Sequence, residues 1–399
     1  MCFLSTWYFA LMIVPAGLGR SAPTLQQGLF PEWYGSRAVL HRCDPYSITT
    51  SSQIQTAIYG RPLEASDQNL NQHRFAYPVF FAFLFLPIAV LPFSSAQFVS
   101  LVACALLTVI ATLFWMLASG VRLHPATCIA LVFASYPVML ALQLRQPTLM
   151  IAALLAATVY CALSGRLGLA GALAAFSTCK PQLAISILLP LAIWGVARWR
   201  KRRAFLTSMA ATLAVLLSCS ELVVRGWFSR WLSTVGAYVH YAGSRPLLAD
   251  LLRGHLFIGA AVLLIAATVW VNIRLQSSDF LLAISFSISA FQLLFPFQIY
   301  NEVLLLPAAL WIAINGARIR ARGQLYVLLF ASTWICLAMG WVSAFGLSLS
   351  NILAPGSGVK LWQLPLIAAW LYPFALFSAL AAYAVAESRI ADKSRSRPA

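Results

Sequence analysis

Apolar runs long enough to cross a bilayer recur along the chain, and they restrict its fold more than any other feature. A transmembrane helix needs about 20 mostly apolar residues. Because 61% of the residues are hydrophobic and only 9% are charged, a water-soluble domain, with roughly 25% charged residues, is excluded. The sequence predicts an all-α polytopic membrane protein with about 12 transmembrane helices. The apolar runs are 2–19, 77–93, 95–119, 125–142, 148–163, 167–197, 204–223, 256–274, 279–295, 298–315, 324–346 and 363–386.

The distribution of basic residues predicts the orientation. The net charge is +17, and Lys and Arg gather in the cytoplasmic loops of membrane proteins, so no nucleic-acid partner is expected. Placing 198–203, 316–322 and the basic tail 388–399 in the cytoplasm puts segments 20–76, 224–255 and 347–362 outside. We expect one integral membrane domain over 1–399, with both termini cytoplasmic and 2–19 as an uncleaved first span.

Two apolar runs leave two threadings open. Run 77–93 is short and proline-rich, and run 167–197 is too long for one simple span and contains Lys180-Pro181-Gln182. Either 77–93 crosses and 167–197 crosses once, or 77–93 is re-entrant and 167–197 crosses twice with a break near Lys180. In the second threading, Lys180 and the polar interruption 143–148 both reach the outer side.

The long outer loop 20–76 is the best place for acid–base chemistry. A loop of this length is usually functional or disordered, and its aromatic residues and mixed charges argue against disorder. The spacing of residues in WYGSRAVLHR (33–42) is typical of a helix, and 51–60 could form a second short helix. The chain has ten carboxylates, and four of them lie in this loop: Glu32, Asp44, Glu64 and Asp67. One could act as a general base, although a solvated surface charge is the alternative for each.

Cations interrupt the apolar runs elsewhere. Lys180 lies in apolar surroundings, where a charge is costly and usually functional, and an anion such as a phosphate or a carboxylate is its expected partner. A lysine that snorkels to the interface is the alternative. Arg145 could fork two hydrogen bonds to a phosphate, or its segment 143–148 could be an ordinary loop. Asn301 and Glu302 form either a tight turn or part of a polar cavity.

The eight cysteines are scattered, and Cys43 has no evident disulfide partner in its loop. No Cys/His spacing typical of a metal site occurs, so we expect no metal-binding residues.

Several stretches, in order, resemble one known family. PEWYGSRAVLHRCDPYS, IQTAIYGRPL and RFAYPVFFAFLFLPIAVLPF, followed by QLRQPTLMIAALL, AGALAAFSTCKPQLA and QIYNEVLLLPAAL, look like glycosyltransferase family 87. That family includes α-mannosyltransferases that use polyprenol-phosphate-mannose. The resemblance covers about residues 28–315 and implies a GT-C fold in a bacterial inner (plasma) membrane, with a structured first extracytoplasmic loop.

The resemblance also implies roles for particular residues. Segment 74–78 would return the outer loop to the membrane beside the donor and acceptor cavity. The donor phosphate would be held by Lys180, Arg145, Arg74, Gln146 and Gln182. The acceptor cavity would contain Trp33, Tyr34, Tyr77 and Asn301.

One position departs from the family pattern, in which an aspartate in a stretch like D-L-Y-P-x-W is the expected catalytic base. The aligned residue here is Gly28, in GLFPEWYG. The base is then Glu32, four residues on, or Asp44 in DPY, or else the protein is a catalytically impaired paralogue.

We therefore expect a hexosyltransferase that moves a sugar, mannose by family default, from a polyprenyl-phosphate donor to an extracytoplasmic glycolipid or glycan. A loop carboxylate would deprotonate the acceptor hydroxyl, and cations would stabilise the departing phosphate. This chemistry requires no cofactor, and a divalent cation could bridge the phosphate. A transporter or flippase of lipid-linked saccharide is the competing reading, since it would use the same cations without a base.

Overall fold

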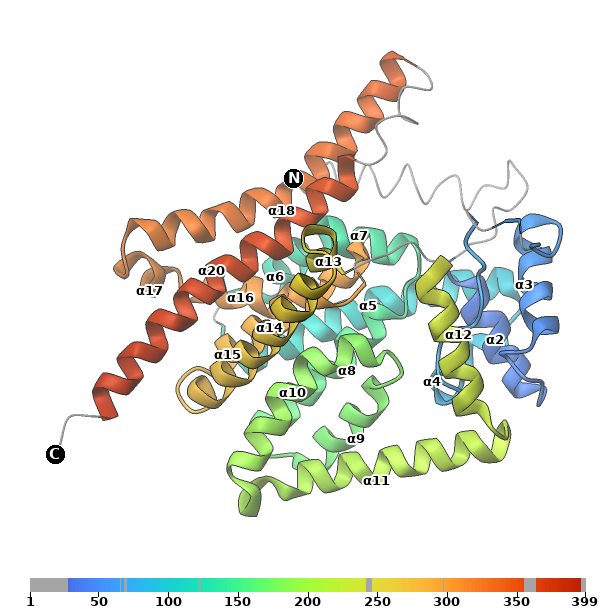
Figure 1. Cartoon of the computed structure of the whole chain (residues 1–399), viewed down its shortest axis with the longest axis horizontal. Helices are drawn as coiled ribbons and strands as arrows, with labels where there is room; N and C mark the ends of the chain where they lie inside the picture. The colour runs from blue at the N-terminus through green and yellow to red at the C-terminus, as the bar shows by residue number, and fades with distance from the viewer. Residues whose placement is uncertain are drawn as a thin grey trace. The chain divides into compact units, whose positions relative to one another are not determined.

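The computed structural model describes residues 28–395, except 65, 68–69, 122, 242–245, 297 and 355–363. It is helical throughout, and no strand occurs in this described part (Figure 1). The predicted first span, 2–19, lies outside the described residues. The helices are α2 (Phe30–Leu40), α3 (Ile48–Tyr59), α4 (Phe80–Ala89), α5 (Phe93–Ser119), α6 (Pro125–Phe133), α7 (Tyr136–Gln143), α8 (Thr148–Leu163), α9 (Leu167–Ser177), α10 (Pro181–Ala197), α11 (Trp199–Val223), α12 (Trp227–Tyr241), α13 (Leu247–Leu251), α14 (His255–Leu275), α15 (Phe280–Leu294), η1 (Ile299–Leu305), α16 (Leu306–Ile314), α17 (Gly316–Ala321), α18 (Gln324–Leu353) and α20 (Leu364–Arg395).

The apolar runs do form helices, but many of these are short. Among the described residues, five helices are long and apolar enough to cross a membrane: α5, α11, α14, α18 and α20. The pair α6 and α7, bent by 70° at its break, makes a sixth if it counts as one span. The other apolar helices have 10–17 residues. This confirms a polytopic membrane protein, while the count of about 12 spans remains a prediction.

Proline accounts for two of the short elements. α4 has 10 residues, which at about 1.5 Å per residue is roughly half of a 30 Å bilayer core, and the next helix begins at Phe93, directly after Pro92. Run 167–197 is broken near Lys180, because α9 ends at Ser177 and α10 begins at Pro181, and the choice between the two threadings stays a prediction. Proline lacks a backbone N–H and is favoured where a helix starts.

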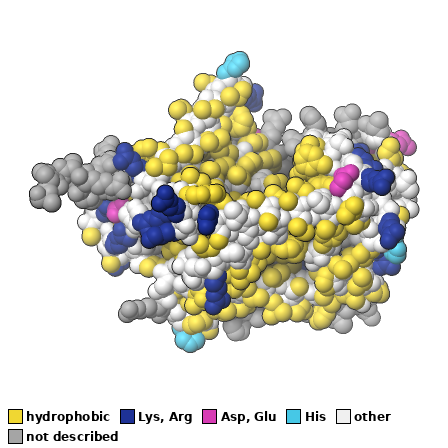
Figure 2. Space-filling view, turned by 90° about the horizontal axis from the view of Figure 1, so that it is seen from below, with side chains coloured by type: hydrophobic (Ala, Val, Ile, Leu, Met, Phe, Trp, Pro, Cys, Tyr) yellow, Lys and Arg dark blue, Asp and Glu magenta, His cyan; other side chains and the backbone are white. Residues whose placement is uncertain are grey.

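Apolar side chains also cover much of the surface. Figure 2 shows broad hydrophobic areas on one face, with Lys and Arg gathered in a few places. Leu222 on α11 is 82% exposed and Leu263 on α14 is 72% exposed. Exposed apolar areas this extensive are unusual for a soluble monomer and are expected where lipid replaces water.

The chain divides into two compact units. The first unit comprises Met1–Ala111, Leu140–Pro181 and Thr207–Ser244, and the second comprises Thr112–Met139, Gln182–Leu206 and Arg245–Ala399. In the first unit, α2 packs on α4, and the indole Nε1 of Trp33 donates to the carbonyl of Leu91 just beyond α4 (3.0 Å).

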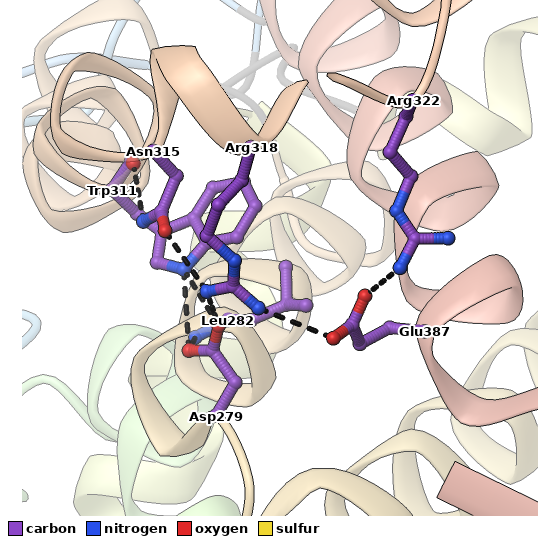
Figure 3. Close-up of polar contacts among 7 residues, drawn as sticks. All are labelled: Asp279, Leu282, Trp311, Asn315, Arg318, Arg322 and Glu387. Atoms are coloured by element: carbon purple, nitrogen blue, oxygen red, sulfur yellow. Dashed lines mark hydrogen bonds and ion pairs between the residues drawn. The ribbon is translucent and has the colours of Figure 1, made fainter. Parts of the chain in front are cut away.

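In the second unit, α15 and α18 both pack against α20. A polar cluster ties four helices of this unit together, α15, α16, α17 and α20 (Figure 3). Asp279, at the start of α15, accepts hydrogen bonds from the indole of Trp311 (3.2 Å) and from Arg318 (3.2 Å). Arg318 also reaches Glu387 on α20 (3.1 Å), and Arg322 pairs with the same carboxylate. A shared network of this kind holds helix ends together better than an isolated surface ion pair does.

Candidate functional site

Glu32 lies in the first turn of α2, where Pro31 sets the start of the helix. Part of the residue reaches the surface, but its Oε2 atom is enclosed and has no hydrogen-bond partner among the residues described. Burial of the carboxyl raises the pKa of Glu32 to about 8, against the opposing effects of a backbone hydrogen bond and the charge of Lys180. A carboxyl with this pKa can take up or release a proton near neutral pH.

Lys180 stands at the break between α9 and α10 and is only 8% exposed. Its Nζ donates a hydrogen bond to Oγ1 of Thr148, the first residue of α8 (2.7 Å). This bond joins the break at Lys180 to the polar turn 143–148. The site therefore combines a buried cation with a nearby carboxyl, both within the first unit.

Arg145 braces the turn 143–148. Its backbone has a φ of 50°, in the left-handed region that non-glycine residues seldom occupy. The guanidinium donates through Nε to the carbonyl of Gln97 on α5 (3.2 Å) and through Nη1 to the carbonyl of Gln143 (2.9 Å). Two of its donors are thus directed at the protein backbone.

Gly28 packs directly on the same turn. A Cβ atom built at this position would lie 2.9 Å from the carbonyl oxygen of Leu144 and 3.0 Å from Nε2 of Gln146. Gln146 itself is buried. Because a backbone carbonyl cannot move aside as a flexible side chain can, only glycine fits here without a shift.

Asp44 has a structural environment that contrasts with that of Glu32. Its Oδ1 accepts a hydrogen bond from the backbone N–H of Tyr46 (3.0 Å), and its Oδ2 forms an ion pair with Arg230 of α12 (2.9 Å). Both oxygens therefore have partners. The pairing with Arg230 was not predicted, since 186 residues separate the two and no local pattern connects them.

The other residues predicted for the site have varied surroundings. The phenol of Tyr34 donates to Gln53 on α3 (3.0 Å), and the carbonyl of Tyr77 accepts from the phenol of Tyr46 (2.7 Å). Nε of Arg74 is enclosed and has no hydrogen-bond partner within the described ranges.

Gln182 and Asn301 belong to the second unit, where the backbone carbonyl of Asn301 accepts from Gln292 (2.9 Å). Glu302 beside it is buried, and its Oε1 has no hydrogen-bond partner in the described part of the chain. The structure thus brings together Glu32, Lys180 and the turn that carries Arg145 and Gln146, and it assigns Gln182 and Asn301 to another unit.

The first-unit site can perform proton transfer beside a held anion. Glu32 offers an enclosed oxygen without a protein partner, and Lys180 offers a positive charge next to it. Within the described residues no group of three or more His, Cys, Asp or Glu side chains could hold a metal ion.

One comparison with known proteins identifies a family. The model of Glycosyltransferase family 87 matches residues 75–297. This range includes the turn 143–148, Lys180 and Arg230, and it begins after Glu32 and Asp44. No curated protein and no solved structure matches the chain.

Proposed function

The chain belongs to glycosyltransferase family 87, and we propose that this membrane glycosyltransferase is a polyprenyl-phosphate-sugar-dependent hexosyltransferase. It moves a hexose, mannose by family default, to a glycolipid or glycan acceptor on the extracytoplasmic side of a bacterial inner membrane. The observation that carries the proposal is the enclosed, unpartnered Oε2 of Glu32 within reach of the charge of Lys180.

In the proposed reaction, Glu32 takes the proton of an acceptor hydroxyl. The acceptor oxygen forms a bond to the anomeric carbon of the donor as the bond from that carbon to the phosphate oxygen breaks. The electron pair of the broken bond remains on the phosphate, which leaves as a polyprenyl-phosphate anion. Lys180 stabilises the charge that develops on the phosphate, most effectively in a site from which water is excluded. The reaction balances without a metal, and a divalent cation bound to the phosphate would add to the effect of Lys180.

Glu32 is a better candidate for the base than Asp44. The two oxygens of Asp44 are held by Arg230 and by the backbone of Tyr46, so using Asp44 would require breaking an ion pair. Oε2 of Glu32 has no such partner among the described side chains. A substrate hydroxyl would therefore satisfy Glu32 where the protein does not.

Most of the remaining predicted residues take supporting roles in this proposal. Arg74 and Gln146 contribute polar groups to donor binding in the first unit, and Gln182 and Asn301, which belong to the second unit, have no role in this proposal. The aromatic side chains of Trp33, Tyr34 and Tyr77 supply flat surfaces for a sugar ring. Arg145 acts on the donor through the turn that it braces.

The test is sugar transfer in proteoliposomes, with radiolabelled polyprenyl-phosphate mannose as donor and a mixed lipid extract as acceptor source. We expect Glu32→Gln to reduce transfer by about 10²- to 10⁴-fold, the usual contribution of a general base. Lys180→Ala should also reduce transfer strongly. Glu64→Gln, which alters an exposed carboxylate of the same loop, serves as the matched control and should retain activity. Undiminished transfer by Glu32→Gln would remove Glu32 from the mechanism.

The same experiment separates the competing functions. Label that crosses the bilayer while still attached to its lipid would indicate a flippase. An intact wild-type protein that transfers nothing from mannose, glucose or arabinose donors would indicate a catalytically impaired paralogue.

A further inference from the structure

We propose that α12 is a latch that holds the first outer loop in place, and that its ion pair Arg230–Asp44 positions Glu32 for transfer. This inference rests on the proposed function and extends it to residues that do not touch the substrate. Arg230 and Asp44 are positioning residues in this account.

Three side chains of α12 contact the middle of the loop, its end and the helix that follows it. Arg230 pairs with Asp44 near the middle of the loop (2.9 Å), and its second amino group donates to the carbonyl of Arg225, which fixes the guanidinium. The indole of Trp231 donates to the carbonyl of Ala76 at the end of the loop (3.1 Å). Trp227 meets Phe80 edge-to-face with ring centroids 6.3 Å apart. A single helix from a distant part of the sequence therefore contacts the loop both at Asp44 and at its end.

A continuous set of contacts leads from the latch to α2. Asp44 fixes the backbone of Tyr46, and the phenol of Tyr46 donates to the carbonyl of Tyr77 (2.7 Å). Phe75, two residues earlier, packs so closely on Gly35 of α2 that a Cβ there would lie 2.2 Å from the ring. Gly35 is three residues after Glu32. A shift at Arg230 is thus passed through a rigid chain of contacts to the helix that carries the base.

The exposure of the pair indicates what its loss would do. The side chains of Arg230 and Asp44 are 41% and 24% exposed. Partly exposed ion pairs contribute little to global stability, so breaking this one should leave the protein folded. Because a displacement of about 1 Å can cost up to a hundredfold in rate, the effect on turnover should exceed the effect on stability.

The experiment compares Asp44→Asn, Arg230→Gln, the double variant and the charge swap D44R/R230D. Each single variant should lower kcat between about tenfold and a hundredfold with little change in KM for the donor. The double variant should be no worse than either single one, and the swap should recover part of kcat. Asp67→Asn is the matched control, because it breaks the ion pair of Arg61 and Asp67 inside the same loop (2.7 Å) without contacting α12. Its kcat should equal that of the wild type.

Hydrogen exchange in nanodiscs tests the latch independently of transfer activity. Arg230→Gln should speed amide exchange in 30–40 and 44–77, while Asp67→Asn should leave 30–40 unchanged. If the wild type transfers no sugar but Arg230→Gln still loosens 30–40, the proposed function fails and the latch stands. The latch would be overturned if Arg230→Gln kept both the kcat and the amide exchange of the wild type. It would also be overturned if the losses of kcat in the two single variants added up in the double variant.

Discussion

At the scale of single residues, environment separates two carboxylates of the same loop. Asp44 is held by a cation and a backbone N–H, whereas Glu32 has an enclosed oxygen without a described protein partner. Desolvation disfavours the ionised form of Glu32, and the nearby charge of Lys180 only partly compensates. These environments support the proposed roles, proton transfer for Glu32 and positioning of the loop for Asp44.

The pKa of Glu32 predicts the pH dependence of transfer. With a pKa of about 8, most of the free enzyme carries a protonated Glu32 at pH 6, and the ionised base becomes about tenfold more abundant per pH unit up to about pH 7. We expect kcat/KM to rise with nearly this slope between pH 6 and 7.5. Transfer assays in buffers of constant ionic strength would measure this pH dependence. The residual kcat/KM of Glu32→Gln should not rise with pH in this range. A wild-type kcat/KM that is already constant from pH 6 upward would contradict the assignment of Glu32 as the base.

Gly28 predicts a second outcome at this scale. A Cβ would meet the carbonyl of Leu144 at 2.9 Å, so Gly28→Ala should destabilise the protein by about 1–3 kcal/mol, the usual cost of overpacking. Gly28→Asp should be no more active than the wild type, although aspartate is the residue expected from the family pattern. Thermal unfolding in detergent would measure the change. Gly168, which has open space around its Cα on α9, provides Gly168→Ala as a control expected to be neutral or slightly stabilising.

Sequence reasoning was sufficient to propose part of this site, whose catalytic role stays a prediction. Glu32 could be identified because carboxylates are scarce, and Lys180 because a cation in an apolar run is costly. The choice between Glu32 and Asp44 could not be made, since it depends on Arg230, 186 residues away from Asp44. The tight fit at Gly28 likewise depends on a turn far along the chain.

At the scale of elements, the breaks between helices carry the polar groups. Lys180 lies between α9 and α10, and Thr148 opens α8 after the turn 143–148. The sequence indicated both breaks, through the polar interruption 143–148 and through Lys180-Pro181-Gln182 in run 167–197. It did not indicate that α4 would have only 10 residues, because hydrophobicity alone does not reveal where a helix ends.

The brace formed by Arg145 predicts the effect of a conservative change. Lysine keeps the charge but lacks the fork that reaches the carbonyls of Gln97 and Gln143. Arg145→Lys should therefore lower the free energy of unfolding by about 1 kcal/mol and raise KM for the donor severalfold, because the turn also places Thr148 against Lys180. Unfolding and donor-titration assays would measure both. Arg166→Lys, at an exposed residue before α9, is the control, and an Arg145→Lys protein indistinguishable from it would refute the brace.

At the scale of the whole molecule, the chain is a membrane glycosyltransferase, and its proposed site includes Glu32 of the long loop 20–76. Hydrophobic composition was sufficient to predict a helical membrane protein, because few alternatives satisfy backbone hydrogen bonds in lipid. The number of spans was less accessible, since short and bent helices such as α6 and α7 read in the sequence as full-length apolar runs.

The proposed orientation makes the last prediction. Cys43 is exposed in the first outer loop, and Arg320 is exposed in the basic segment α17. In a chain whose other cysteines are replaced by alanine, a membrane-impermeant maleimide should label Cys43 in right-side-out vesicles. Arg320→Cys in a fully cysteine-free chain should be labelled only in inverted vesicles, because Lys and Arg are retained on the cytoplasmic side. The opposite pattern at both positions would place Glu32 on the cytoplasmic face, and a donor and acceptor from that side would then have to be sought.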